Sequence, residues 1–133
     1  MTERHQRQHE ELLHLADTIL ENASNAHFVR SGDFTRLRLQ FAKALKVHCD
    51  EEAITVHTAV ARGDLSPDIV SKFGRDLVAW RADIVSSNGQ WSPANVLKDY
   101  DGFRRSFGPV VKALHDYIAR ENREILAVID RHN

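Results

Sequence analysis

The sequence contains a single cysteine, Cys49, among its 133 residues, which excludes an intramolecular disulfide and indicates a reducing compartment. No apolar run approaches about 18 residues, the length that a membrane-spanning helix needs. The start, Met1-Thr-Glu-Arg-His, lacks the apolar stretch of a secretion signal. Lys and Arg are not in excess, because the net charge is −1 with histidines neutral, and this argues against a nucleic-acid-binding surface. We therefore expect a cytoplasmic protein that binds neither membranes nor nucleic acid.

The alternation of apolar and polar residues that predicts β-strands is also missing. Apolar residues instead recur every three or four positions, which predicts amphipathic helices. With 42% apolar and 28% charged residues, the chain has the composition of a folded soluble protein. Its length suits one domain over residues 1–133. We therefore expect a single all-α domain.

The six glycines and three prolines are few, and they mark the expected helix ends. Ser66-Pro67 and Ser92-Pro93 each place a capping serine before a proline at the first helical position. Thr2 and Asp33 are further cap candidates, Asn88-Gly89 is an expected stop, and Gly108-Pro109 either kinks the last helix or marks its start. We predict helices over about residues 3–24, 34–61, 67–87, 93–100 and 104–131.

Four of these helices are long and are joined by short links. This pattern is typical of an antiparallel up-down-up-down four-helix bundle, here with a short extra helix between the third and fourth long ones. Such bundles often build cofactor sites from polar side chains on facing helices. The polar residues on the inward stripes are therefore the candidates for function.

The helix over residues 34–61 carries two such residues, His48 and Glu52, on an otherwise apolar stripe. They lie one turn apart and share a face. An unpaired carboxylate buried there would be costly, so Glu52 must meet a proton, a hydrogen-bond donor, a cation or a metal ion. Cys49 lies off this stripe, and we expect no reactive thiol.

Two other helices add polar residues to the same interior. The first helix places His9 on its inward stripe, and the last places Tyr117 and Glu121 one turn apart. Carboxylate and imidazole suit iron, manganese and zinc, and a phenolate oxygen favours ferric iron. The third helix offers no ligand, since its stripe reads Val70, Phe73, Leu77, Trp80 or Arg81, and Ile84, which we predict to be core.

These residues resemble the hemerythrin-like family, also called the HHE cation-binding domain, over most of the chain. His9, within Gln8-His9-Glu10-Glu11, is similar to the first-helix ligand of that family. His48-Cys49-Asp50-Glu51-Glu52 resembles its second-helix His-x-x-x-Glu motif, and Tyr117-Ile118-Ala119-Arg120-Glu121 resembles its last-helix motif with tyrosine in place of histidine. The resemblance implies a four-helix bundle with a non-haem iron site, in which Glu52 and Glu121 would be the bridging carboxylates.

The chain departs from the family in its histidines. The third helix of the family supplies two, and here it supplies none, while Tyr117 replaces another. His115 does not repair this, because it lies about 200° round the helix from Tyr117. The resemblance therefore implies a reduced site in which a mononuclear or loosely held iron is easier to accept than reversible oxygen carriage. The expected metal ligands are His9, His48, Glu52, Tyr117 and Glu121.

Other interpretations stay open. His48 and Glu52 are also explained as a buried hydrogen-bonded pair, Glu121 as a partner of a nearby arginine, and Tyr117 as a core residue that donates to Glu52 or Glu121. On that view the domain has lost its metal and is a regulatory or binding module. A ferritin-like site is disfavoured, because Glu-x-x-His occurs once, at Glu11–His14, and off the inward stripe.

We find no nucleophile motif and no phosphate-binding glycine loop, so we do not expect an enzyme. The expected partners are a metal ion and dioxygen or another small ligand, and a homodimer is a further candidate. Trp91, before Ser92-Pro93, is expected to be exposed and to mark a contact. The remaining histidines are expected on the surface: His5, His14, His27, His57, His115 and His132.

Overall fold

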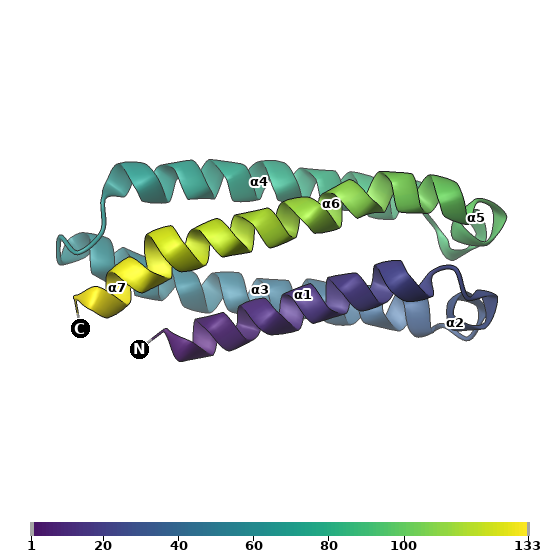
Figure 1. Cartoon of the computed structure of the whole chain (residues 1–133), viewed down its shortest axis with the longest axis horizontal. Helices are drawn as coiled ribbons and strands as arrows, with labels where there is room; N and C mark the ends of the chain where they lie inside the picture. The colour runs from purple at the N-terminus through teal and green to yellow at the C-terminus, as the bar shows by residue number, and fades with distance from the viewer. Residues whose placement is uncertain (1, 133) are drawn as a thin grey trace.

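The computed structural model describes residues 2–132, and within this range the regular elements are helices, with no strand. The long helices are α1 (Glu3–Asn22), α3 (Asp33–Ala61), α4 (Pro67–Gln90) and α6 (Tyr100–Glu121). The short ones are α2 (Ala26–Arg30), α5 (Pro93–Lys98), the π-helix η1 (Asn122–Leu126) and α7 (Ala127–Arg131). In Figure 1, η1 and α7 continue the line of α6. None of the helices within residues 2–132 combines the length and apolar character needed to cross a membrane.

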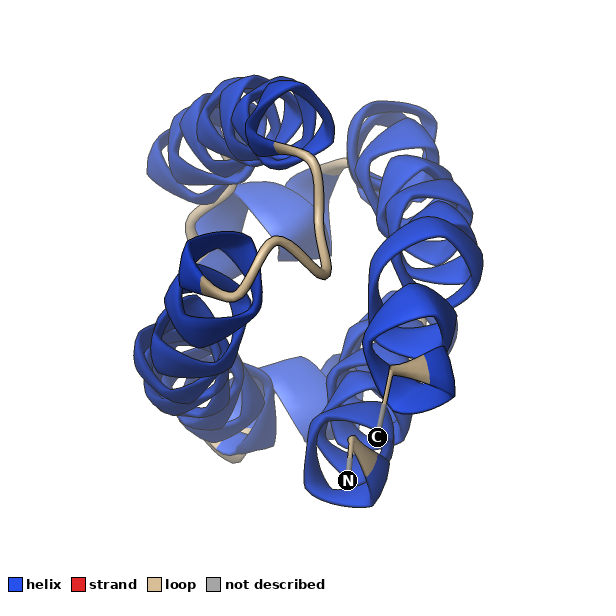
Figure 2. Ribbon diagram, turned by 90° about the vertical axis from the view of Figure 1, so that its left-hand side faces the viewer, coloured by secondary structure: helices blue, strands red, loops and turns tan. Residues whose placement is uncertain are grey.

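The long helices form a bundle and lie side by side along the length of the molecule (Figure 1 and Figure 2). α1 packs against α3 and α6, and α4 packs against α6. α2 and α5 close one end of the bundle, where they contact each other. α3 and α4 approach each other less closely than these pairs do. The prediction of an all-α fold is confirmed.

Aromatic rings fill the end of the bundle that α2 and α5 close. The ring of Phe103 lies with its centroid 5.6 Å from Phe34, 5.9 Å from Trp91 and 5.2 Å from Phe107. Edge-on and offset contacts of this kind are the favoured geometries of aromatic pairs. Trp91 is only 9% exposed, so the prediction of an exposed contact residue is wrong. The indole ring of Trp91 points into the core, where it makes an edge-type contact with the ring of Phe103.

The serine–proline starts are confirmed, while other helix ends differ from prediction by a few residues. Ser66 caps α4 and Ser92 caps α5 with their side chains. α4 continues through Asn88-Gly89 to Gln90, and α6 begins at Tyr100, where the Asp99 side chain accepts a hydrogen bond from Gly102 N. Pro109 lies inside α6, so Gly108-Pro109 does not begin that helix.

Two predicted caps have other roles. Asp33 is the first residue of α3 and not its cap, because the chain turns at Gly32, whose φ of 91° suits glycine. Thr2 occupies the N-cap position of α1, as predicted, but its side chain makes no capping hydrogen bond to that helix. Its hydroxyl donates to Asp130 Oδ2 at 2.7 Å, and its backbone N donates to Asp130 Oδ1 at 3.2 Å. Both ends of the described chain are thereby joined.

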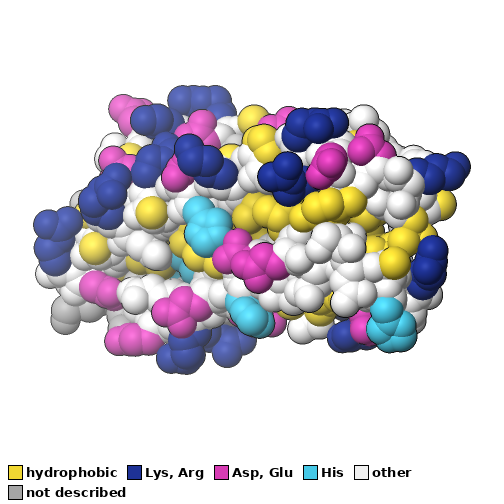
Figure 3. All heavy atoms as spheres, turned by 45° about the vertical axis from the view of Figure 1, so that its right-hand side comes forward, with side chains coloured by type: hydrophobic (Ala, Val, Ile, Leu, Met, Phe, Trp, Pro, Cys, Tyr) yellow, Lys and Arg dark blue, Asp and Glu magenta, His cyan; other side chains and the backbone are white. Residues whose placement is uncertain are grey.

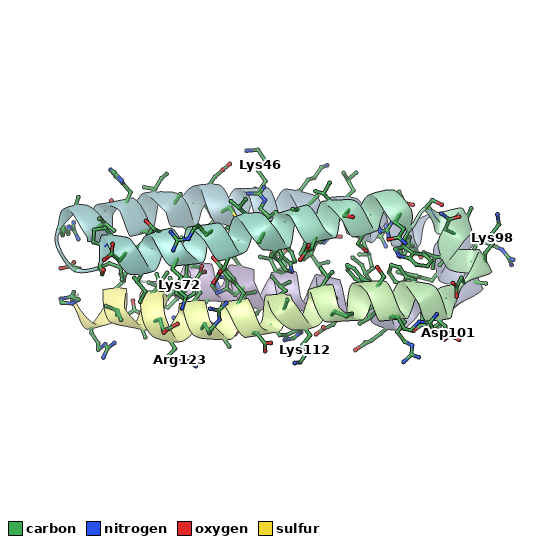
Figure 4. The ribbon with its side chains drawn as sticks, turned by 90° about the horizontal axis from the view of Figure 1, so that it is seen from above. Lys46, Lys72, Lys98, Asp101, Lys112 and Arg123 are labelled. Carbon is green, nitrogen blue, oxygen red and sulfur yellow. The ribbon has the colours of Figure 1, made fainter. Side chains whose placement is uncertain are left out.

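The charged residues lie mainly on the outside. Lys46 on α3 and Lys112 on α6 are exposed and point away from the bundle on opposite sides (Figure 4). On the face drawn in Figure 3, basic and acidic side chains are interspersed around a strip of hydrophobic ones. This face has no large patch of one sign, as expected from the net charge of −1.

Two helical glycines give a matched test of the packing. A Cβ on Gly102 would clash with Asp99 Oδ2 and lie 2.7 Å from Trp91 Cη2, whereas a Cβ on Gly74 would meet nothing within 4 Å. We expect Gly102→Ala to lower the free energy of unfolding by about 1–3 kcal/mol, because the cap or the Trp91 ring must move. Gly74→Ala should raise it by up to about 1 kcal/mol. Urea unfolding followed by circular dichroism measures both. Equal effects of the two changes would contradict this account.

Candidate metal centre

Three helices bring their inward polar residues together in the middle of the bundle. α1 supplies His9, α3 supplies His48 and Glu52, and α6 supplies Glu121, and all four side chains are buried. The pairs α1–α3 and α1–α6 pack directly, so the three inward stripes face one another. The sequence predicts each of these four residues on an inward stripe, and the structure agrees.

The four side chains converge closely. One ligand-type atom from each lies within 4.8 Å of the others. His9 Nε2 is 2.9 Å from Glu121 Oε1 and 3.3 Å from Glu52 Oε2, and His48 Nε2 is 2.8 Å from Glu52 Oε2. Two imidazoles and two carboxylates therefore share one small volume.

Two of these carboxylate oxygens lack a hydrogen bond. Glu52 Oε2 and Glu121 Oε1 are fully buried, and among residues 2–132 neither has a partner with hydrogen-bond geometry. They lie near imidazole nitrogens, as the distances above show, but the N–H directions do not point at them. A buried acceptor without a donor costs about 1–3 kcal/mol, and more when it is charged. A cation or a hydrogen-bond donor between these two oxygens would remove this cost.

The orientation of His48 is fixed by a chain of polar side chains. Its Nδ1 lies 2.7 Å from Gln8 Oε1. The amide nitrogen of Gln8 donates to Glu51, and Arg4 in turn donates to Glu51 at 2.7 Å. Because Glu51 only accepts hydrogen bonds, it fixes the amide of Gln8 with its oxygen toward His48. The Nδ1 of His48 then carries the proton, and Nε2 faces Glu52.

His9 is held in the same manner by a residue of η1. Its Nδ1 lies 2.8 Å from Asn122 Oδ1, which accepts the ring proton. Asn122 directly follows Glu121, and both side chains reach the centre. The π-helix begins at this residue, and such wide turns occur often at functional sites. Both imidazoles thus present Nε2 to the carboxylates.

Tyr117 lies beside the centre and contacts Glu121. Its hydroxyl donates to Glu121 Oε2 at 2.7 Å and is 3.4 Å from the backbone oxygen of Phe73. Burial raises the pKa of Tyr117, so the phenol stays protonated here. The prediction that a core tyrosine donates to one of the two glutamates is confirmed for Glu121. Its role as a metal ligand stays a prediction.

Burial and neighbouring charges set the protonation of the centre. Burial opposes the ionised form of Glu52, but the adjacent imidazoles of His48 and His9 outweigh it and hold the pKa of Glu52 below its usual range. Burial likewise opposes the His9 cation, yet Glu121 and Glu52 raise the pKa of His9 to about 10. Burial is also the main reason that the pKa of Glu121 is raised. Of the two carboxylates, Glu52 therefore keeps its negative charge to lower pH.

α4 contributes an apolar wall, as the sequence predicts. Phe73, Trp80 and Ile84 are buried, and Leu77 is partly buried. A cavity of about 150 Å³ lies between Phe73 and Leu77 of this wall and the His/Glu cluster. Cys49 lines the cavity although it was predicted off the inward stripe, and burial raises the pKa of its thiol to about 11. A raised pKa keeps the thiol protonated at neutral pH.

His5 contradicts the prediction of a surface position. It is 6% exposed, and its Nε2 lies 2.8 Å from Thr55 Oγ1. The signal was present, because His5 precedes His9 by one turn on the same stripe. The other histidines predicted at the surface agree with the structure. His115 is half-exposed and lies 2.9 Å from Asp17, and four are exposed: His14, His27, His57 and His132.

Gln8 and Asn122 were not predicted as part of the site. Gln8 stands next to His9 in the sequence, but its contact is with His48 on another helix, which no local pattern reveals. Asn122 reaches His9 only because the helix widens at this residue. Both are amides, and their value here is that a carbonyl oxygen accepts a ring proton without adding charge.

Comparison of the chain with protein-family models, with curated proteins and with solved structures found no match. The similarity to hemerythrin-like domains therefore rests on the order and spacing of His9, His48, Glu52 and Glu121, and family membership stays a prediction.

Proposed function

We propose that this chain is a metal-binding domain of hemerythrin-like type, with an antiparallel up-down-up-down bundle that holds one transition-metal ion. Iron is the first candidate. The ligands would be His9, His48, Glu52 and Glu121. One observation carries the proposal: four buried donor atoms from three helices converge, and two of their carboxylate oxygens lack any hydrogen bond among the described residues.

The separations between donor atoms suit a shared ion. Ligand atoms at about 2.1 Å from one metal, at tetrahedral or octahedral angles, lie roughly 3.0–3.4 Å apart. The contacts of His9 Nε2 with Glu121 and Glu52, at 2.9 and 3.3 Å, are close to this range. Imidazole and carboxylate together are the donor types of non-haem iron(II) sites.

The hydrogen bonds around the two histidines also favour a metal. Histidine ligands usually donate their second ring proton to an oxygen, which fixes the tautomer and leaves the other nitrogen free to bind the ion. Gln8 and Asn122 supply such oxygens to His48 and His9. Each ring therefore keeps Nε2 for the centre.

A single ion fits the donor set better than two. α4 faces the centre with Phe73 and Leu77, so no ligand comes from that side. Four protein ligands would leave an ion with an open position toward the cavity. We infer that the domain handles or senses iron, dioxygen or another small ligand, and that it does not carry oxygen reversibly.

Metal uptake tests the proposal directly. Protein from iron-replete medium should contain one metal ion per chain by elemental analysis, and removing the ion should lower stability, because the ion binds only the folded state. At a free metal concentration about 100-fold above Kd the stabilisation is about 2.7 kcal/mol. His48→Ala should abolish this gain. His57→Ala, an exposed histidine on the same helix, should retain it.

The metal proposal is wrong if the wild-type chain takes up no stoichiometric metal from iron or zinc solutions. It is equally wrong if His48→Ala and His57→Ala bind metal alike. In the first case, stability in chelator and in added metal would coincide for the wild type. In the second, added metal would stabilise both variants to the same extent.

Tyr117 acts, we propose, through Glu121, whose oxygen it orients. Tyr117→Phe should weaken metal binding by roughly 10–100-fold, which is typical for the loss of a group that positions a ligand. Tyr100→Phe, which changes the only other tyrosine, should leave binding unchanged. Titration with iron measures both. A visible phenolate-to-iron(III) absorption band that disappears in Tyr117→Phe would instead make Tyr117 a ligand.

A second candidate function is a metal-free regulatory or binding module. It is favoured by the raised pKa of His9, because an imidazolium between Glu121 and Glu52 supplies the positive charge that a metal would otherwise provide.

The two functions differ in the response to Glu52→Gln. In a metal-free module this change removes a buried charge and should keep or raise the free energy of unfolding. In a metal domain it should abolish the stabilisation by added metal. Glu10→Gln, at an exposed position of α1, is the control. Thermal unfolding with and without metal distinguishes the two outcomes.

A further inference from the structure

The cavity beside the His/Glu cluster has the size of a small organic molecule. Its volume is about 150 Å³. An engineered apolar cavity of about 150 Å³ binds benzene. The cavity extends from the polar cluster to the α4 wall, so it has one polar end and one apolar body.

The apolar body consists of side chains from all four long helices. α4 supplies Phe73 and Leu77, α6 supplies Leu114 and Ile118, α3 supplies Leu45, and α1 supplies Leu12. Such walls gain dispersion contacts from an apolar guest and offer water no hydrogen bonds. They select a compact aromatic or branched aliphatic group.

The polar end offers acceptors. Glu52 Oε2 and Glu121 Oε1 belong to residues that line the cavity, and neither has a hydrogen-bond partner among residues 2–132. Those two atoms are closed off from the cavity, but the side chain of Glu52 keeps 11% exposure. A guest with one hydroxyl group would therefore donate to the Glu52 carboxylate, and a hydrogen bond to a charged acceptor is stronger than one between neutral groups. The neighbouring Cys49 thiol adds no charge, because burial keeps it protonated.

Exposed lining residues on α3 and α4 indicate where the cavity opens. Ala53 on α3 and Gly74 on α4 both line the cavity and are both exposed. A methyl group added at Gly74 would meet nothing within 4 Å. The cavity therefore reaches the surface at two small residues, on helices that contact each other less than the other neighbouring pairs do. We infer that a guest enters on this side.

We propose that this cavity binds a small phenol or aromatic alcohol, with the ring against Phe73 and Leu77 and the hydroxyl donating to Glu52. The inference shares its polar end with the proposed metal centre but rests on the cavity, so it does not require a metal. Metal content is read by elemental analysis and guest binding by the guest's own signal. Failure of one is therefore distinguishable from failure of the other.

The test uses 4-fluorophenol and fluorobenzene with the full chain, both as purified and after chelation, followed by fluorine NMR. Both guests should show saturable binding below about 1 mM, and the phenol should bind the chelated protein roughly tenfold more tightly, because only the phenol donates to a carboxylate. The absence of saturable binding for both guests would overturn the proposal. Equal affinity of the two guests would overturn the assignment of the hydroxyl.

Two pairs of variants locate the guest. Leu77→Trp fills the body of the cavity, and Val78→Trp changes the next residue, which is 69% exposed. Ala53→Phe obstructs the mouth, and Ile54→Phe changes the next residue, which is 71% exposed. Leu77→Trp and Ala53→Phe should each weaken binding at least tenfold, roughly the effect of losing one good contact. Both controls should bind as the wild type does.

The Ala53→Phe pair keeps the test decisive if Leu77→Trp does not fold, because residue 53 is exposed and its side chain can be enlarged without repacking the core. Retention of the helical circular dichroism spectrum identifies the folded variants. Undiminished binding by a folded Leu77→Trp or Ala53→Phe variant would place the guest elsewhere and contradict the proposal.

Discussion

The burial of two carboxylates beside two imidazoles is the constraint on which this structure depends. An isolated buried carboxylate is strongly disfavoured, and here Glu52 and Glu121 lie in the middle of a bundle. Their neighbours determine which atoms are charged and which nitrogens face inward. The apolar packing of α1, α3 and α6 holds the backbones at the distance that these contacts need. A displacement of any of the three helices would therefore separate the carboxylates from the imidazoles, at an electrostatic cost in addition to the loss of packing.

The helices and the four residues that converge at the centre could be predicted from the sequence. A helical face is a periodic property, so His48 and Glu52 could be assigned to one face from their spacing alone. Ser66 and Ser92 could be assigned as caps because the cap acts within three residues. The burial of Trp91 could not be predicted, because it depends on contact with the ring of Phe103, which lies in the first turn of α6.

The residues that orient the two histidines could not be predicted from the sequence, for a physical reason. Gln8 and Asn122 act across helices, and which side chain meets which depends on the relative height of α1, α3 and α6. Helical periodicity gives the direction of a side chain and not its height relative to another helix. The position of Asn122 also depends on the wide turn η1, which residue propensities do not encode. These two amides convert a group of buried polar residues into a defined set of inward-facing nitrogens.

The π-helix η1 determines the orientation of α7, which follows it in the chain. One additional residue is accommodated in a single turn, so the residues of α7 are rotated and displaced relative to an uninterrupted continuation of α6. Asp130, which holds Thr2, reaches its partner with this offset in place. Deleting one residue between 122 and 126 would restore a regular α-helix and turn Asp130 away by about 100°. The same wide turn that presents Asn122 to His9 thus sets the phase at which the last helix meets the first.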